Sequence, residues 1–287
     1  MGLYATLGVD TATTLPTSFI AGSTAKSAYA QITAAAPFTS SRVIVRIEST
    51  PTVGNENTGL FDLATGPSLG ETVIIPDMLY SMCPSEDVQS QYDFPLRIAA
   101  GDRIAVRGGS GASNTFRVSV QLLAQVDQGG CPTSGSVATY GAVLAPGTGI
   151  DSFHGTQVDP GLVANTKGAW SVLTSSTTAV HEWITLAVGR PSNDGADDYG
   201  HWLVDIATGA PGAEVVVASD LPFDQVNSGV FVVGGPITYS PLGPLPIAVP
   251  LGTALSVRAQ CNLTTAVGFP SGTTLRLFDA VLYGVNP

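Results

Sequence analysis

The sequence predicts an all-β protein made of two tandem antiparallel jelly-roll-like β-sandwich domains that arose by internal duplication. Three observations predict this fold: an internal repeat, short segments in which apolar and polar residues alternate, and clusters of Gly, Pro, Asn and Ser between those segments. Of the 287 residues, 44% are hydrophobic and only 11% are charged, so the chain carries enough apolar surface for packed cores.

The repeat is clearest around one block of seven residues. Leu60–Gly66 reads Leu-Phe-Asp-Leu-Ala-Thr-Gly and reappears at Leu203–Gly209 as Leu-Val-Asp-Ile-Ala-Thr-Gly. Other blocks match in the same order: 26–29 with 167–170, 43–47 with 184–188, 101–107 with 252–258, and 116–118 with 275–277. We therefore expect a first sandwich at residues 1–126, a linker at 127–135, and a second sandwich with longer loops at 136–287.

The matched blocks alternate with the period of a β-strand. Val43, Val45 and Ile47 share one face of a segment, as expected for a half-buried antiparallel strand. The alanine-rich segment Ala25–Ala36 resembles a helix, but its counterpart around Gly168 is rich in residues that disfavour one. Because duplicated segments share structure, we expect strands in both.

The Asp-x-Ala-Thr-Gly block predicts a strand that ends at a hairpin. Gly66 and Gly209 would supply the positive φ that such a turn requires. Asp62 and Asp205 would accept hydrogen bonds from turn amides, with a metal or sugar ligand as the alternative interpretation.

The charge balance argues against two classes of partner. Twenty-two acidic residues outweigh eleven basic ones, giving a net charge of −11, and the basic residues are scattered. We expect no nucleic-acid partner and no membrane partner, because both need clustered Lys and Arg or long apolar segments. The N-terminus lacks the pattern of a secretory signal.

The residues that could support chemistry are few. All three histidines, His154, His181 and His201, fall in the second copy, and no Gly-x-Ser-x-Gly motif is present. If both copies shared a catalytic function, each would need a catalytic base such as histidine, and the first copy has none. We therefore expect no enzyme and no catalytic residue. A hydrolase that uses His201 is the weakest alternative. The three cysteines show no metal-binding spacing, and we expect no cofactor and no bound metal.

One cluster is a candidate ligand or partner contact. Asp194, Asp197 and Asp198 lie in a dense acidic loop, followed by Tyr199 and Trp202. The loop lacks the spacing of a calcium-binding hand, which favours a solvated turn over a Ca²⁺ site. Trp202 is the tryptophan expected to be exposed for sugar stacking, whereas Trp170 and Trp183 are expected in the core.

Several segments of the second copy resemble structural proteins of tailed bacteriophages and prophages. These segments are Asn165–Trp170, Asp205–Val217 and Gly252–Gln260; the first copy follows them more loosely, with Ser27 in place of Gly168. The resemblance implies a location in the virion and carries over no catalytic residue.

The resemblance leads us to expect a decoration or stabilising protein on the outer capsid surface, assembled in the host cytoplasm. The alternatives are a tail, collar or fibre component, or a glycan-binding adhesin module. The expected partners are other virion proteins, such as major capsid or tail proteins, and a host-surface glycan is a further candidate. Attachment to a symmetric particle favours a homo-oligomer, either a trimer or a ring.

Overall fold

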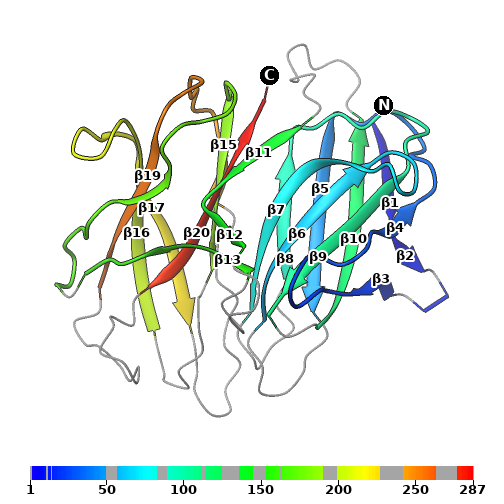
Figure 1. The fold of residues 1–287 in the computed structure, drawn as a ribbon, viewed down its shortest axis with the longest axis horizontal. Helices are drawn as coiled ribbons and strands as arrows, with labels where there is room; N and C mark the ends of the chain where they lie inside the picture. Colours follow the sequence, from blue (N-terminus) through cyan, green and yellow to red (C-terminus); the bar gives the residue numbers. More distant parts are fainter. Residues whose placement is uncertain are drawn as a thin grey trace.

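The computed structural model describes residues 2–10, 12–13, 15–49, 57–82, 89–111, 114–124, 136–144, 153–161, 163–189, 199–226, 242–262 and 277–286. Within these ranges the chain forms twenty strands and no helix, which confirms the predicted all-β class (Figure 1). The first lobe holds β1 (Leu3–Leu7), β2 (Val9–Asp10), β3 (Leu15–Ile20), β4 (Ala30–Thr33), β5 (Arg42–Ser49), β6 (Asn57–Thr65), β7 (Thr72–Met82), β8 (Gln89–Phe94), β9 (Ile104–Ser110) and β10 (Thr115–Ala124). The second lobe holds β11 (Val137–Tyr140), β12 (Ala142–Leu144), β13 (Phe153–Val158), β14 (Ser171–Thr174), β15 (Trp183–Gly189), β16 (Tyr199–Thr208), β17 (Val215–Val226), β18 (Leu242–Leu245), β19 (Leu255–Cys261) and β20 (Phe278–Val285).

The two lobes share one topology. In the first lobe a six-stranded sheet ordered β2-β3-β10-β5-β8, with β1 also on β10, faces a four-stranded sheet ordered β4-β9-β6-β7. The second lobe repeats both sheets with each strand number raised by ten, and every strand pairing is antiparallel. The architecture of two sandwich-like halves is therefore as the repeat predicts, while the proposed linker at 127–135 lies outside the described residues.

Small contacts repeat along with the strands. Thr17 Oγ1 donates to the Gly8 carbonyl oxygen at 3.2 Å, and Thr156 Oγ1 donates to the Gly141 carbonyl oxygen at 3.0 Å. Likewise, Gly66 and Gly209 both have φ of 110°, which confirms the predicted positive φ at the hairpin. The predicted strands in the alanine-rich segment and its counterpart are β4 and β14.

One block of the predicted repeat is in the wrong register. Val118 pairs with Ile47 on β5, and Ala280 pairs with Val188 at the equivalent position of β15. The counterpart of Phe116 is therefore Phe278, not Leu275. A short apolar-Arg-apolar pattern fits any strand of the right alternation, so only the partner strand fixes the register.

Each lobe has its own apolar interior, and the first continues into the interface between the lobes. In the first lobe Phe61, Tyr80 and Phe116 pack edge to face, and in the second Phe223 packs on Phe278. All eight residues of β20 are buried because one face of this strand lines the second interior while the other lies against the first lobe. The sandwich interiors are thus separate, but the lobes are joined by a buried apolar contact.

The interface places β11 and β15 against β7, and β13 against β6, of the first lobe (Figure 1). From β20, the Tyr283 side chain reaches β7. The Phe153 ring covers Gly109, where a Cβ would lie 2.3 Å from a ring carbon. The Tyr283 hydroxyl accepts from the Leu79 N–H at 2.8 Å and donates to the Asp77 carbonyl oxygen at 2.9 Å. Thr139 Oγ1 donates to the Pro76 carbonyl oxygen at 2.6 Å.

Candidate functional site

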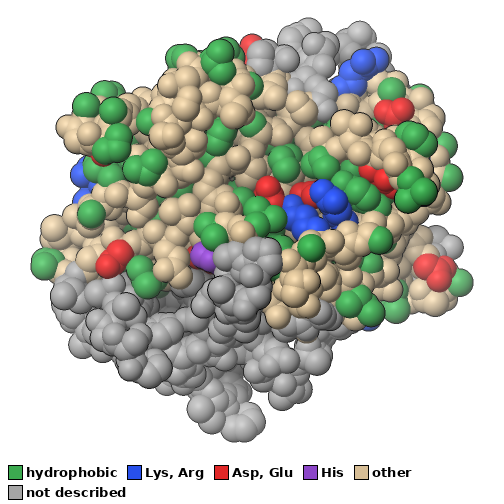
Figure 2. All heavy atoms as spheres, viewed as in Figure 1, with side chains coloured by type: hydrophobic (Ala, Val, Ile, Leu, Met, Phe, Trp, Pro, Cys, Tyr) green, Lys and Arg blue, Asp and Glu red, His purple; other side chains and the backbone are tan. Residues whose placement is uncertain are grey.

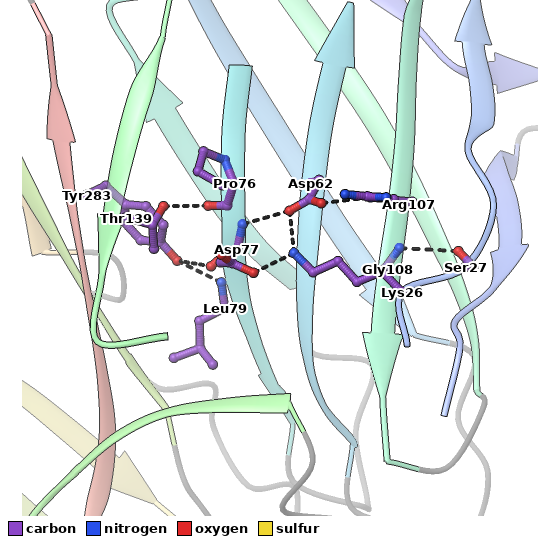
Figure 3. A network of polar contacts seen from close by, with 10 residues as sticks. All are labelled: Lys26, Ser27, Asp62, Pro76, Asp77, Leu79, Arg107, Gly108, Thr139 and Tyr283. Carbon is purple, nitrogen blue, oxygen red and sulfur yellow. Dashed lines mark hydrogen bonds and ion pairs between the residues drawn. The ribbon is translucent and has the colours of Figure 1, made fainter. Parts of the chain in front are cut away.

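The repeated polar residues of the first lobe form one ion network on the outer face of the sheet β4-β9-β6-β7 (Figure 3). Lys26 Nζ forms ion pairs with Asp62 and Asp77, and Arg107 Nε donates to Asp62 Oδ2 at 2.8 Å. The Arg107 guanidinium also lies 4.7 Å from the centre of the Tyr29 ring. Burying Asp62 is tolerable because two cations and a backbone N–H from Asp77 contact its carboxylate.

The second lobe builds the same network from the equivalent residues. Lys167 Nζ lies 2.7 Å from Asp205 Oδ1 and 2.9 Å from Asp220 Oδ1. Arg258 Nε donates to Asp205 Oδ2 at 3.0 Å, and its guanidinium lies 4.4 Å from the centre of the Trp170 ring. The charged residues that recur in the repeated blocks therefore pair with one another in each lobe.

A bulge in the edge strand brings the network together. The register between β6 and β7 shifts on both sides of Leu63, and Asp77 has φ of 54°. This left-handed residue points its N–H at Asp62 Oδ1, 3.0 Å away; in the second lobe Asp220, with φ of 55°, does the same to Asp205. Asp62 and Asp205 thus accept from an amide on the neighbouring strand, and the prediction that they bond hairpin amides is wrong.

The two networks differ in exposure. The Asp77 side chain is 19% exposed, whereas that of Asp220 is 59% exposed. Burial raises the pKa of the Asp205 carboxyl, but hydrogen bonds from Lys167, from the Asp220 N–H and from Arg258 together hold that pKa below its usual range. Asp205 therefore stays a carboxylate near neutral pH, and a group held in this way is a poor proton donor.

A cleft of about 520 Å³ opens beside the network of the first lobe, at the junction with the second. Figure 2 shows acidic and basic side chains gathered near the middle of this face, with apolar side chains around them. Lys26, Asp77 and Arg107 line the cleft from the first lobe, and Leu144 and Phe153 line it from the second. This cleft is the candidate functional site, because it combines a concave surface, apolar walls and converging charges.

The residues predicted to contact a ligand do not lie at this cleft. Trp202 is only 2% exposed and stacks on Phe223 inside the second sandwich, so its predicted role as an exposed sugar platform is wrong. Its position on β16 places it on the same face as Val204 and Ile206, which point into the core. Tyr199 lies in β16, but the structure does not describe its side chain. Asp194, Asp197 and Asp198 lie outside the described residues.

The half-exposed tryptophan of the ion network is Trp170, which was predicted to lie in the core. Leu173 is buried, and the alternation of β14 puts Val172 and the preceding Trp170 on the opposite, outer face. The sequence did contain a signal for the network itself. Lys26, Asp62, Asp77 and Arg107 all recur in the second copy of a chain that has few charged residues.

Over the described ranges, no three His, Cys, Asp or Glu side chains converge as metal ligands would. The same ranges contain no helix long and apolar enough to cross a membrane.

Comparisons with known proteins leave the chain without an assigned family. No family model matches, and no curated protein matches. The solved structures with some likeness are distant. PNGF-II is 9% identical with a TM-score of 0.34, over 98% of this chain and 65% of that one. The tandem CBM22-1-CBM22-2 domain of Xyn10C from Paenibacillus barcinonensis is 10% identical with a TM-score of 0.23, over 86% of this chain and 79% of that one. The structure of infectious bursal disease virus strain Gx is 12% identical with a TM-score of 0.24, over 99% of this chain and 70% of that one. TM-scores this low transfer neither a fold family nor a function.

Proposed function

We propose that the chain is a non-enzymatic structural protein of a tailed-bacteriophage virion, and that it decorates and stabilises the outer surface of the capsid. The observation that carries the proposal is the ion network. In each lobe, two cations and two carboxylates pair with one another. The polar residues common to both copies therefore act in holding the fold, which fits a structural protein better than a shared catalytic site.

Two further features support this proposal. The segments that resemble phage structural proteins include Lys167, Asp205 and Arg258, which are network residues. The lobes are also fixed to each other by a buried contact through Phe153 and Tyr283, so the molecule would present its outer faces in one arrangement. A fixed arrangement suits attachment to a regular lattice, because every copy must meet its neighbours in the same geometry.

Purified particles provide the test. Particles would be isolated from a host that carries the gene with a C-terminal tag, and from a matched host in which the gene is deleted. We expect the tagged protein in the particle fraction, at a ratio to the major capsid protein that densitometry places close to the number of capsid sites. Deletion should lower the temperature at which heads release DNA.

The stoichiometry separates the outcomes. If densitometry finds only a few copies per particle, the protein is a tail, collar or fibre component of the virion and not a capsid decoration protein. Absence from washed particles, with the protein stable and abundant in the lysate, would refute a virion role altogether.

A further inference from the structure

The cleft between the lobes contains hydrogen-bonding groups that the ion network leaves unused. Arg107 contacts Asp62 through Nε, and Asp77 contacts Lys26 through Oδ1. In the part of the chain that the structure describes, the two terminal nitrogens of Arg107 and Oδ2 of Asp77 have no hydrogen-bond partner. Both residues line the cleft, so a pair of N–H donors and a carboxylate acceptor are available to a ligand.

These groups are held in place before any ligand arrives. The Arg107 guanidinium is fixed at one end by buried Asp62 (Figure 3). Along its face it is fixed by the Tyr29 ring. Asp77 is fixed by Lys26 and by its place in the bulge of β7. Ordering a side chain on binding costs affinity, so groups already ordered by the fold bind more tightly.

Charge and shape together narrow the class of ligand. The four charges of the network, from Lys26, Arg107, Asp62 and Asp77, sum to zero, so the cleft does not select strongly for either sign. The wall supplied by Val73 and Leu144 is apolar, and Leu144 is 49% exposed. A ligand that fits combines hydroxyls, which both donate and accept, with an apolar C–H face.

We propose that the cleft is a binding site for a neutral glycan. Arg107 donates to, and Asp77 accepts from, adjacent hydroxyls of one sugar ring, while Leu144 and Val73 contact the C–H face of that ring. The volume of about 520 Å³ falls within the range of small-molecule sites. This proposal goes beyond the virion role and does not rest on it.

The second lobe provides a matched control. Arg258 has the same Nε contact with a buried aspartate and the same stacking on an aromatic ring, but it does not line the cleft. Substituting Arg107→Lys and Arg258→Lys keeps the charge in both networks and removes the paired terminal nitrogens in each. If the two variants differ in glycan affinity, the difference therefore arises from the position of Arg107 in the cleft. The loss of a network arginine is common to both variants and cannot explain it.

The experiment uses the full chain on an array of neutral hexose and N-acetylhexosamine oligosaccharides, printed beside sialylated and sulfated ones. The strongest neutral binder is then titrated by calorimetry. We expect Arg107→Lys to weaken binding about tenfold or more, and Arg258→Lys to leave it within about twofold. Melting temperatures of the two variants would show whether both remain folded.

A second variant keeps the test decisive if Arg107→Lys fails to fold. Leu144→Asp puts a charge where the proposal places the C–H face of the sugar, and because this position is exposed it should weaken binding about tenfold or more without unfolding the chain. Absence of binding to every neutral glycan, a preference for acidic glycans alone, or equal affinity of all three variants and the wild type would each overturn the proposal. None of these results would affect the particle test, so failure of one proposal is distinguishable from failure of the other.

Discussion

The two lobes share one fold and one ion network but differ in what lies over them. In the first lobe, the edge strand β7 lies against β11 and β15 of the second lobe and forms hydrogen bonds with Tyr283 of β20. Ile74 and Ile75 of β7 are buried, whereas the equivalent Val217 and Ala218 of β17 in the second lobe are only partly buried. Duplication thus produced two equivalent faces, of which one became a docking surface within the chain.

The residues that differ between the copies explain why only one face is covered. Gly109, which makes room for Phe153, corresponds to Gln260, and Leu79, whose N–H contacts Tyr283, corresponds to Pro222. Proline has no N–H to donate, and its place on an edge strand discourages pairing. The approaching surface also differs, since Tyr283 corresponds to Gln121 in the first lobe. The interface therefore requires Gly109 and Leu79 from the first lobe and Tyr283 from the second, and it cannot form with the two lobes exchanged.

The largest effect is expected from removing the side chain that joins the lobes. Tyr283→Ala should lower the free energy of unfolding by about 3–5 kcal/mol, because it empties a buried aromatic site and leaves the Leu79 N–H unpaired. Gln121→Ala, the equivalent change on the half-buried outer face of β10, should cost less than about 0.5 kcal/mol. Urea denaturation of both variants measures the difference. Equal losses would show that the interface contributes no more than an exposed strand.

A smaller effect is expected from adding one methyl group beneath Phe153. Gly109→Ala should cost about 1–3 kcal/mol, because the new Cβ would lie 2.3 Å from the ring and must displace it. Gln260→Ala, at the equivalent place in the second lobe, should change stability by less than about 0.5 kcal/mol. Thermal melts followed by circular dichroism test this pair, and an unchanged melt for Gly109→Ala would contradict the close packing at the junction.

The equivalent positions Ser40 and His181 predict a difference in acid sensitivity. Both donate a backbone N–H across the sandwich, to Ile98 and Val249, but His181 is a fully buried imidazole beside the Tyr140 hydroxyl. Burial lowers the pKa of His181, so the neutral ring is favoured in the folded state.

Stability should therefore fall as the pH drops below the ordinary histidine value of about 6.5, by at most about 1.4 kcal/mol per pH unit, and level off below the lowered pKa. His181→Ser, which copies the first lobe, should remove this slope between pH 6.5 and 5 although it lowers stability at pH 7. Unfolding titrations across that range test the prediction, and a slope that survives the substitution would assign the acid sensitivity to other groups.

The smallest difference between equivalent positions is expected at the two left-handed aspartates. Asp77→Asn should cost more than Asp220→Asn, because the first pairs with a buried lysine and the second is largely solvated. We expect less than about 1 kcal/mol for Asp220, as for other exposed ion pairs, and about 1–3 kcal/mol for Asp77. Asparagine tolerates the left-handed backbone in both, so strain does not confuse the comparison. Equal costs would show that cover by the second lobe does not strengthen the network.

The fold was predictable because its signals are local or repeated. Alternation within a strand, glycine at Gly66 and the recurrence of whole blocks are all visible within short stretches of sequence. The site was harder to predict because its contacts join distant residues. Lys26 and Asp62 are 36 positions apart, and Phe153 meets Gly109 only after the lobes dock. The wrong prediction for Trp202 was avoidable, since the strand period places it with buried Val204 and Ile206.

The position of β20 has a consequence for how the molecule is made. This strand is central to one sheet of the second lobe, and its Tyr283 ring packs against Tyr92 and Phe94 at the edge of the first. A ribosome releases β20 after every other strand in the part of the chain that the structure describes. During synthesis, Tyr92 and Phe94 of the first lobe therefore lack their contact with Tyr283 until β20 has been made. The formation of β20 then completes the second sandwich and this part of the interface together.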